Sequence, residues 1–221
     1  MDIKLQGVRN IRDFSEYGFP GHIRSAHLHD MTKGDAEILS KQYHLKTVID
    51  LRTAIERKEQ PDHVMESVEY LHIPLFEEAR IGISHERSTQ EMGMLLPDMA
   101  KLYRNIVTDE FSKAQIKKVM EIINDNGRDG AVLWHCTEGK DRCGIISALF
   151  LLSKGIDKDT VMLDYLKTNE PSEKRAEYYY SVALDKSGNS ATAEKVRDVF
   201  LAKREYMEPV IEIMLSQIRR V

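Results

Sequence analysis

Residues 132–150, VLWHCTEGKDRCGIISALF, decide the fold of this chain. An apolar run ends in the pair His135-Cys136, and a helical pattern of apolar residues begins immediately after Gly144. A short apolar run followed by turn residues is typical of a buried strand. The stretch therefore predicts a strand, a tight loop and a helix in direct succession.

The loop in this stretch has the properties of an anion-binding site. The first N–H groups of a helix have no partner within the helix, and the helix dipole adds partial positive charge there. Arg142, six residues after Cys136, can offer two parallel donors to two phosphate oxygens. The same field stabilises Cys136 as a thiolate, the reactive form of cysteine. These residues predict attack of sulfur on phosphorus through a phosphocysteine intermediate.

The spacing Cys-x5-Arg resembles the signature loop of protein-tyrosine phosphatases. In detail, residues 135–144 resemble the bacterial atypical tyrosine and lipid phosphatases, whose loop reads His-Cys-x-x-Gly-Lys-Asp-Arg. Shorter segments resemble other elements of that family in the same order: residues 10–13, 24–32, 48–53 with Glu56, and 164–169. The resemblance implies an α/β cysteine-phosphatase fold with a small central parallel or mixed sheet flanked by helices. It also implies hydrolysis of phosphotyrosine-containing protein or phosphoinositide without metal or cofactor.

Length and composition agree with this expectation. A chain of 221 residues suits one sizeable domain, so we expect residues 1–221 to form a single phosphatase-like domain. The formal net charge of −4 argues against a nucleic-acid-binding surface. No apolar run reaches the length of a membrane span, the N-terminus lacks an apolar signal segment, and two cysteines make no secreted disulfide framework. We therefore expect a cytoplasmic protein, unless it uses an export route that the sequence does not show.

The rest of the chain alternates helix and strand patterns. Helices are expected at residues 32–43, 99–107 and 111–123, and short strands at residues 46–51 and 70–73. Turn residues 124–130 lead into the central strand, whose carboxyl end should carry the site.

Glycine, proline and polar residues mark the ends of later elements. Gly155 should end the helix after the loop, and Asp157 should start the next. Pro171 and Pro209 suit the first turns of later helices. Residues 77–92 and 185–192 look least structured. The first is either a mobile flap beside the site or a plain solvated loop.

Three residues are the candidates for catalysis. Cys136 is the expected nucleophile and Arg142 the expected phosphate ligand. The leaving oxygen needs a proton donor, and the resemblance favours Asp141 within the loop. Its alternative role is a helix N-terminal cap or an ion-pair partner of Lys140. Asp98 is the rival acid, although it also suits the N-cap of the helix that follows it.

The other loop residues are expected to bind the phosphate. They are Thr137, Glu138, Gly139, Lys140, Cys143 and Gly144. The Gly139 amide must approach the anion with unusual backbone angles, and Gly144 should let the helix pack against the strand. The resemblance gives His135 a role in holding the loop and lowering the pKa of the thiol. Asp50, at a strand end, either supports catalysis or forms a structural tie with Arg52 and the pair at residues 12–13.

Three positions bear on substrate choice and turnover. Lys140 is either an extra cation for a second phosphate or a surface lysine screened by Glu138. Glu138 departs from the family's usual small residue, and its charge disfavours polyanionic substrates. Cys143 stands where the family usually has Thr or Ser, and a thiol is a weaker donor, which predicts slower hydrolysis of the intermediate. A reversible disulfide between Cys136 and Cys143 is also conceivable, although only a narrow range of loop geometries would allow the bond.

Two other functions remain open beside a tyrosine or dual-specificity phosphatase. One is hydrolysis of a small phosphorylated molecule such as an inositol phosphate. No polybasic segment accompanies the loop, although His22, Arg24, Arg80 and Arg87 could assemble a basic rim in space. The other is a module that recognises phosphate without turnover. The complete set of Cys136, Asp141 and Arg142 disfavours it.

Overall fold

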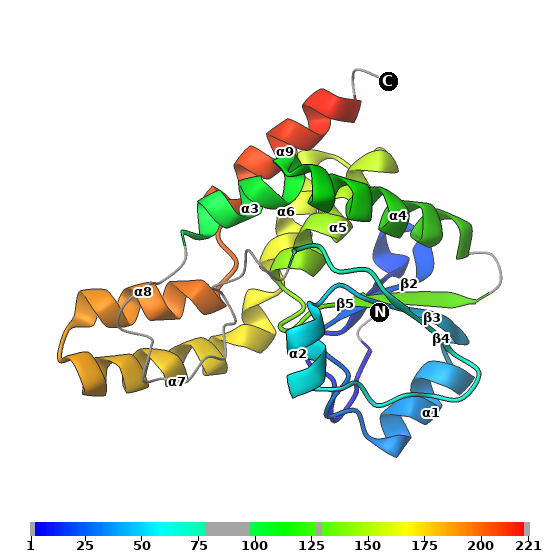
Figure 1. Ribbon diagram of the computed structural model, residues 1–221, viewed down its shortest axis with the longest axis horizontal. Helices are drawn as coiled ribbons and strands as arrows, with labels where there is room; N and C mark the ends of the chain where they lie inside the picture. Colours follow the sequence, from blue (N-terminus) through cyan, green and yellow to red (C-terminus); the bar gives the residue numbers. More distant parts are fainter. Residues whose placement is uncertain (1–2, 78–97, 127–129, 219–221) are drawn as a thin grey trace.

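The computed structural model describes residues 3–77, 98–126 and 130–218, which alternate between strands and helices (Figure 1). The strands are β1 (Arg12–Phe14), β2 (Phe19–Ser25), β3 (Leu45–Asp50), β4 (Glu69–His72) and β5 (Ala131–His135). A 3-10 turn, η1 (Ser15–Tyr17), joins the first two. The helices are α1 (Lys33–Lys41), α2 (Ala54–Glu59), α3 (Met99–Thr108), α4 (Glu110–Asn126), α5 (Asp141–Ser153), α6 (Lys158–Leu166), α7 (Asn169–Ser187), α8 (Ser190–Phe200) and α9 (Arg204–Ile218).

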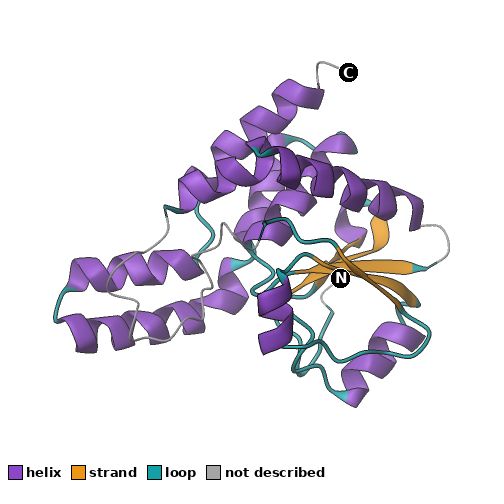
Figure 2. Ribbon diagram, viewed as in Figure 1, coloured by secondary structure: helices purple, strands orange, loops and turns teal. Residues whose placement is uncertain are grey.

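The strands form one mixed sheet in the order β1-β2-β5-β3-β4 (Figure 2). β5 lies in the centre and runs parallel to both of its neighbours, whereas β1 is antiparallel to β2. The predicted α/β fold with a small mixed sheet flanked by helices is thus confirmed. Because the three inner strands are parallel, their carboxyl ends meet at one edge of the sheet, where Cys136 follows β5.

The sheet separates two apolar cores. α1 covers one face, and the helices from α3 to α6 together with α9 lie over the other (Figure 1). Successive side chains of β5 alternate between them: Leu133 belongs to the core under α1, while Val132 and Trp134 belong to the larger core. All three are fully buried. A strand buried on both faces explains why the sequence there is apolar throughout.

Several predicted boundaries agree with the structure. Thr32 caps α1 through a capping box with Asp35, and Asp157 caps α6. Gly155 follows α5 with a positive φ of 82°. The strands β1 and β2 were not foreseen, because β2 carries Pro20 and Gly21, residues more typical of turns.

The expectation of an irregular segment at residues 185–192 is wrong. Helix α7 continues to Ser187, and α8 begins at Ser190. Gly188 ends α7 in the left-handed conformation, and the side chain of Asn189 caps α8 by accepting from the amide of Thr192. The polar residues are thus the tip of a tight helical hairpin, which lies to one side of the sheet (Figure 1).

The expected position of Pro209 is also wrong. It lies inside α9, which begins already at Arg204, and not in the first turn. The buried side chains of Met207, Val210 and Ile211 on the same helix pack into the core. Tertiary packing of this face therefore outweighs the local cost of a proline in the helix.

One predicted segment lies almost wholly outside the described residues. Of the segment at residues 77–92, expected to be a flap or a loop, only Glu77 is described. Within the described residues, no helix combines the length and apolarity needed to cross a membrane.

Truncating a side chain of the central strand tests whether both of its faces are buried in apolar cores. We expect Leu133→Ala to lower the free energy of unfolding by about 2–5 kcal/mol, because it leaves a cavity in a fully buried strand. Val64→Ala, at a side chain that is 69% exposed, is the matched control and should change stability little. Chemical denaturation measures both. Equal stability of the two variants would contradict the assigned burial.

Candidate active site

Cys136 lies directly after β5, at the carboxyl edge of the sheet, and only 2% of it is exposed. Burial opposes the thiolate. The hydrogen bond from the Cys143 thiol, the positive charge of Arg142 and the amide of Cys143 outweigh that effect and lower the pKa of Cys136 to about 6. The cysteine is therefore largely a thiolate at neutral pH, as the sequence predicts.

Cys143 is a free, fully buried thiol in the first turn of α5. Its sulfur lies 3.6 Å from the carbonyl oxygen of Ser25 and 3.8 Å from that of Trp134. Burial and the neighbouring Cys136 raise the pKa of Cys143 well above its usual value, so it keeps its proton and can donate to the thiolate. Cys143 thus stands where the resembled family usually has Thr or Ser, and its single S–H hydrogen can go to the Cys136 sulfur or to one of these carbonyls. Cys136 is also a free thiol here, and the conceivable disulfide stays a prediction.

Side chains from outside the loop hold its carbonyl groups. The amide of Asn10 donates to the carbonyls of Glu138 (3.0 Å) and Gly139 (2.9 Å). The fully buried guanidinium of Arg24 donates to the carbonyl of Gly139 (2.7 Å) and more weakly to that of Lys140 (3.4 Å). With their carbonyls held on the outside, the loop residues can turn their N–H groups toward the centre, as an anion-binding nest requires.

A buried carboxylate connects these supports. Asp164 on α6 pairs with Arg12 at 3.1 Å and with Arg24 at 3.3 Å. Arg12 in turn donates to the side-chain oxygen of Asn10 at 2.9 Å. The segments at residues 10–13, 24–32 and 164–169, far apart in the chain, thus form one scaffold under the loop.

Gly139 has the backbone that the sequence predicts. Its φ is +66°, and a Cβ atom there would lie 2.6 Å from the backbone of Ser25 and Ala26. Both the conformation and the close approach require glycine. Gly144 serves a different purpose than expected: a Cβ there would meet the ring of Tyr165 on α6 at 3.1 Å and Met207 on α9 at 3.3 Å. It allows packing between helices and not between helix and strand.

Arg142 is oriented by Glu56, a residue not predicted as part of the site. The guanidinium and the carboxylate form two hydrogen bonds of 2.6 Å each. The hydroxyl of Thr137 donates to Glu56 at 2.5 Å and accepts from Arg142 at 3.2 Å. Although burial opposes the charged form, Arg142 holds the pKa of Glu56 well below its usual range. Arg142, the expected phosphate ligand, is therefore held in one orientation by partners within the protein.

Glu56 could have been found from the sequence by its local motif. It is the fourth residue of the capping box that starts α2, in which Thr53 and Glu56 bind each other's amides. The capping box holds one carboxylate oxygen of Glu56 at Thr53, which orients the carboxylate toward Thr137 and Arg142 of the signature loop.

Asp141 begins α5 and is nearly buried. Its Oδ1 accepts from the hydroxyl of Tyr103 at 2.5 Å and lies 3.1 Å from Nζ of Lys140. Its negative charge opposes ionisation of the Cys136 thiol, so the two groups lie within electrostatic range. The rival Asp98 caps α3 by accepting from the amide of Lys101 and is exposed.

Lys140 is not the surface lysine of the second alternative. The side chain is only 1% exposed, and its Nζ donates to the carbonyls of Val199 (2.6 Å) and Leu201 (3.3 Å) at the end of α8. A cation at this end of a helix is favoured by the helix dipole. Lys140 therefore fastens the α7–α8 hairpin to the loop, and its expected role toward a second phosphate stays a prediction.

Glu138 is also engaged within the protein. It pairs with Arg9 at 3.1 Å and with Arg175 of α7 at 3.4 Å. Its charge is therefore compensated, and the predicted repulsion of polyanions is weakened. Two of the four residues expected in a basic rim are described, and neither contributes to one: Arg24 is buried under the loop, and His22 contacts the carbonyl of Ile123. Arg80 and Arg87 lie outside the described residues.

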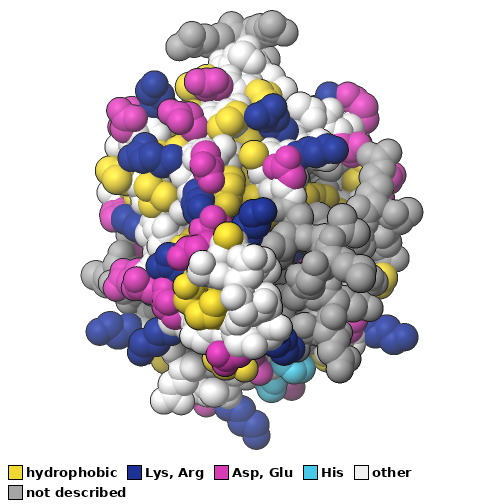
Figure 3. Space-filling model, turned by 90° about the vertical axis from the view of Figure 1, so that its left-hand side faces the viewer, with side chains coloured by type: hydrophobic (Ala, Val, Ile, Leu, Met, Phe, Trp, Pro, Cys, Tyr) yellow, Lys and Arg dark blue, Asp and Glu magenta, His cyan; other side chains and the backbone are white. Residues whose placement is uncertain are grey.

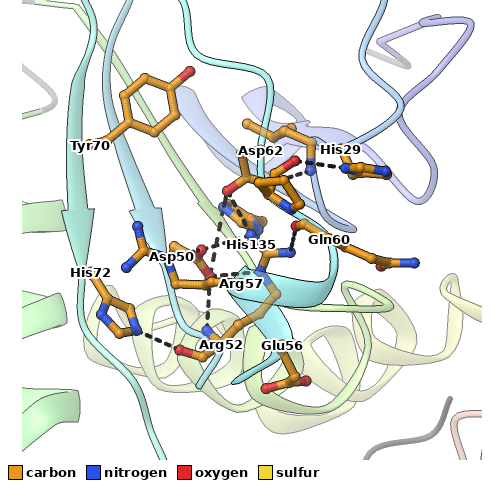
Figure 4. A network of polar contacts seen from close by, with 12 residues as sticks. His29, Asp50, Arg52, Glu56, Arg57, Gln60, Asp62, Tyr70, His72 and His135 are labelled. Carbon is orange, nitrogen blue, oxygen red and sulfur yellow. Dashed lines mark hydrogen bonds and ion pairs between the residues drawn. The ribbon is translucent and has the colours of Figure 1, made fainter. Parts of the chain in front are cut away.

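A second polar network lies behind the loop (Figure 4). Asp50 pairs with Arg52 at 2.8 Å and with Arg57 at 3.1 Å, and Arg52 also reaches Asp62 at 2.8 Å. Nε2 of His135 lies 3.1 Å from Asp62 and 3.9 Å from Asp50. Asp50 thus takes part in a structural tie with Arg52. Of the pair at residues 12–13, Arg12 does not join this tie, because it pairs with Asp164.

His135 fastens strand ends together in this network. Burial opposes its protonated form, but the carboxylates of Asp50 and Asp62 raise the pKa of His135. Its side chain reaches the end of β3 and the segment after α2, and its carbonyl accepts from the amide of Leu51 at 2.9 Å. It anchors the start of the loop to the sheet. Its expected effect on the thiol stays a prediction.

Among the described residues, Asp50, Asp62 and His135 offer ligand atoms within 4.8 Å of one another, close enough for a metal ion. The guanidinium of Arg52 already donates to both carboxylates. A second cation would meet that fixed positive charge, so this group does not suit a metal.

Comparisons with known proteins found a matching family and several relatives. A family model described as "Tyrosine phosphatase family" matches residues 3–219. A tyrosine-protein phosphatase of Nostoc commune is 34% identical over 146 residues, which are 65% of this chain and 46% of that protein. The triple specificity protein phosphatase PtpB of Mycobacterium tuberculosis is 36% identical over 72 residues, 33% of this chain and 25% of that protein. The chain thus spans less than half the length of these curated relatives. A crystal structure of P. aeruginosa TpbA is 17% identical, covers 94% of this chain and 91% of its own, and gives a TM-score of 0.40.

Neutralising Glu56 tests whether it orients Arg142. We expect Glu56→Gln to lower kcat/KM for an aryl phosphate roughly tenfold, the effect of one charge-assisted hydrogen bond. Glutamine still completes the capping box, so α2 should persist. Glu59→Gln, an exposed change on the same helix, is the control. If both variants keep wild-type activity, Glu56 has no such role.

The thiolate can be titrated by alkylation. We expect the rate of reaction of Cys136 with iodoacetamide to rise with pH around a midpoint near 6, because the lowered pKa leaves the thiol ionised above that pH. Cys143→Ala removes a donor and should raise the midpoint, whereas Cys143→Ser keeps a donor and should leave it low. An unchanged midpoint in Cys143→Ala would contradict the contact between the two sulfurs. Cys136→Ser shows the background reaction.

Proposed function

The chain belongs to the tyrosine phosphatase family, and from this membership we propose that it hydrolyses phosphate monoesters through a phosphocysteine formed on Cys136. The observation that carries the proposal is the buried Cys136 thiolate, with a pKa near 6, next to an Arg142 that Glu56 holds in place. Nucleophile and phosphate ligand thus occupy one loop. Residues 1–221 are proposed to act as one catalytic domain.

The residues divide the reaction between them. The Cys136 sulfur attacks phosphorus while the phosphorus–oxygen bond to the leaving group breaks. Arg142 and the loop amides of residues 137–144 bind the phosphoryl oxygens. Asp141 gives its proton to the leaving oxygen and then takes one from the water that attacks the phosphocysteine. Cys143 donates to the sulfur as it leaves. His135 and Asp50 support the loop from behind (Figure 4).

We propose phosphotyrosine in proteins as the substrate class. Lys140, the cation that would favour a second phosphate, is committed to the carbonyls of α8. Arg9 and Arg175 beside the loop both pair with Glu138, which neutralises one of their two charges. On the face that includes the tip of the α7–α8 hairpin, acidic and basic side chains are interspersed (Figure 3). These features favour a substrate with one phosphate over a phosphoinositide.

Turnover by matched variants tests the proposal. Wild type, Cys136→Ser and Asp141→Asn are compared on p-nitrophenyl phosphate, a phosphotyrosine peptide and a phosphoinositide, with and without chelator. We expect activity that chelator does not change, none in Cys136→Ser, and faster turnover of the peptide than of the lipid. Asp98→Asn is the matched control for the acid and should keep wild-type activity.

Other outcomes would favour the other readings. Turnover confined to an inositol phosphate would make the chain a phosphatase of small molecules. Binding of phosphate without turnover of any ester would make the loop a recognition site. Loss of activity on adding chelator would contradict the metal-free mechanism.

A further inference from the structure

We propose that Tyr103 of α3 is a positioning residue for Asp141. This inference rests on the proposed function, in which Asp141 is the proton donor. It goes further by assigning how the carboxyl group is held. The tyrosine lies outside the signature loop, and nothing in the sequence around it indicates such a role.

The contact between the two side chains is short and buried. The Tyr103 hydroxyl donates to Oδ1 of Asp141 at 2.5 Å, and Tyr103 is fully buried. The hydroxyl of Tyr165 lies 2.8 Å from that of Tyr103. Burial and the negative charge of Asp141 raise the pKa of Tyr103 well above its usual value. Tyr103 therefore keeps its proton at every working pH and acts only as a donor to Asp141.

Lys140 approaches the same oxygen from another direction. Its Nζ lies 3.1 Å from Oδ1 of Asp141 while it donates to the carbonyls of Val199 and Leu201. Oδ1 thus accepts a hydrogen bond from Tyr103 of α3 and forms an ion pair with Lys140, which is anchored at the end of α8. Two partners from separate elements restrict the rotation of the carboxyl group, as a catalytic group requires.

Asp141, held in this way, moves one proton in each step. In the first step, its carboxyl group gives a proton to the leaving oxygen as the sulfur–phosphorus bond forms and the phosphorus–oxygen bond breaks. In the second step, its carboxylate takes a proton from the attacking water. Tyr103 neither gains nor loses a proton in either step.

The dependence of the rate on the leaving group distinguishes a role of Tyr103 in positioning Asp141 from a role in protein stability alone. Phenyl phosphate needs the acid, whereas 2,4-dinitrophenyl phosphate leaves readily without it. We expect Tyr103→Phe to lower kcat/KM for phenyl phosphate roughly tenfold and for the dinitrophenyl ester at most about twofold, as for loss of one bond to a charged group. Inhibition by inorganic phosphate should stay at the wild-type level. In an Asp141→Asn background, Tyr103→Phe should have no further effect.

Tyr165→Phe is the matched control. It removes a hydroxyl from the same buried group without touching the bond to Asp141, so both esters should be affected equally. If Tyr103→Phe lowers kcat/KM equally for both esters, Tyr103 has only a structural role and the proposal is overturned. The same follows if Tyr165→Phe reproduces the dependence on the leaving group, or if Asp141→Asn shows none. Failure of wild type to hydrolyse either ester would instead refute the proposed function.

Discussion

The site is built around a negative charge that has to exist inside the protein, at the sulfur of Cys136. Burial alone would keep this thiol protonated. Arg142, the Cys143 thiol and the amide of Cys143 reverse that effect. Each of these groups has to be placed within reach of one atom, and much of the surrounding structure serves that placement.

Two groups of polar side chains from outside the loop hold the loop in a fixed conformation. On one side, Asn10 and Arg24 hold the carbonyls of the loop and are joined through Arg12 to Asp164. On the other side, Glu56 fixes Arg142 by two bonds. Buried charges of this kind are tolerated because each is paired and hydrogen-bonded. Their contribution lies in the geometry that they impose on the loop, since ion pairs taken from water add little net stability.

The positions of Lys140 and Asp141 connect the chemistry to distant helices. From the sequence, Lys140 is either a cation for a second phosphate or a surface lysine screened by Glu138. In the fold, the end of α8 offers unpaired carbonyls next to it, and the lysine satisfies them. Asp141 is in contact with both Lys140 and Tyr103. The proposed acid is thus held by side chains from α3 and from the loop that α8 anchors.

The sequence by itself determined the strand, loop and helix at residues 132–150, the reactive Cys136 and the need for glycine at position 139. These features follow from residues close together in the chain: the apolar pattern, the Cys-x5-Arg spacing, and a backbone conformation that only glycine adopts easily. Only the tertiary structure decided the roles of Glu56, Tyr103, Asp164 and Lys140. Their partners lie tens of residues away in the chain, and a side chain's function depends on which groups the fold brings within hydrogen-bonding distance. Residue type alone leaves that choice open.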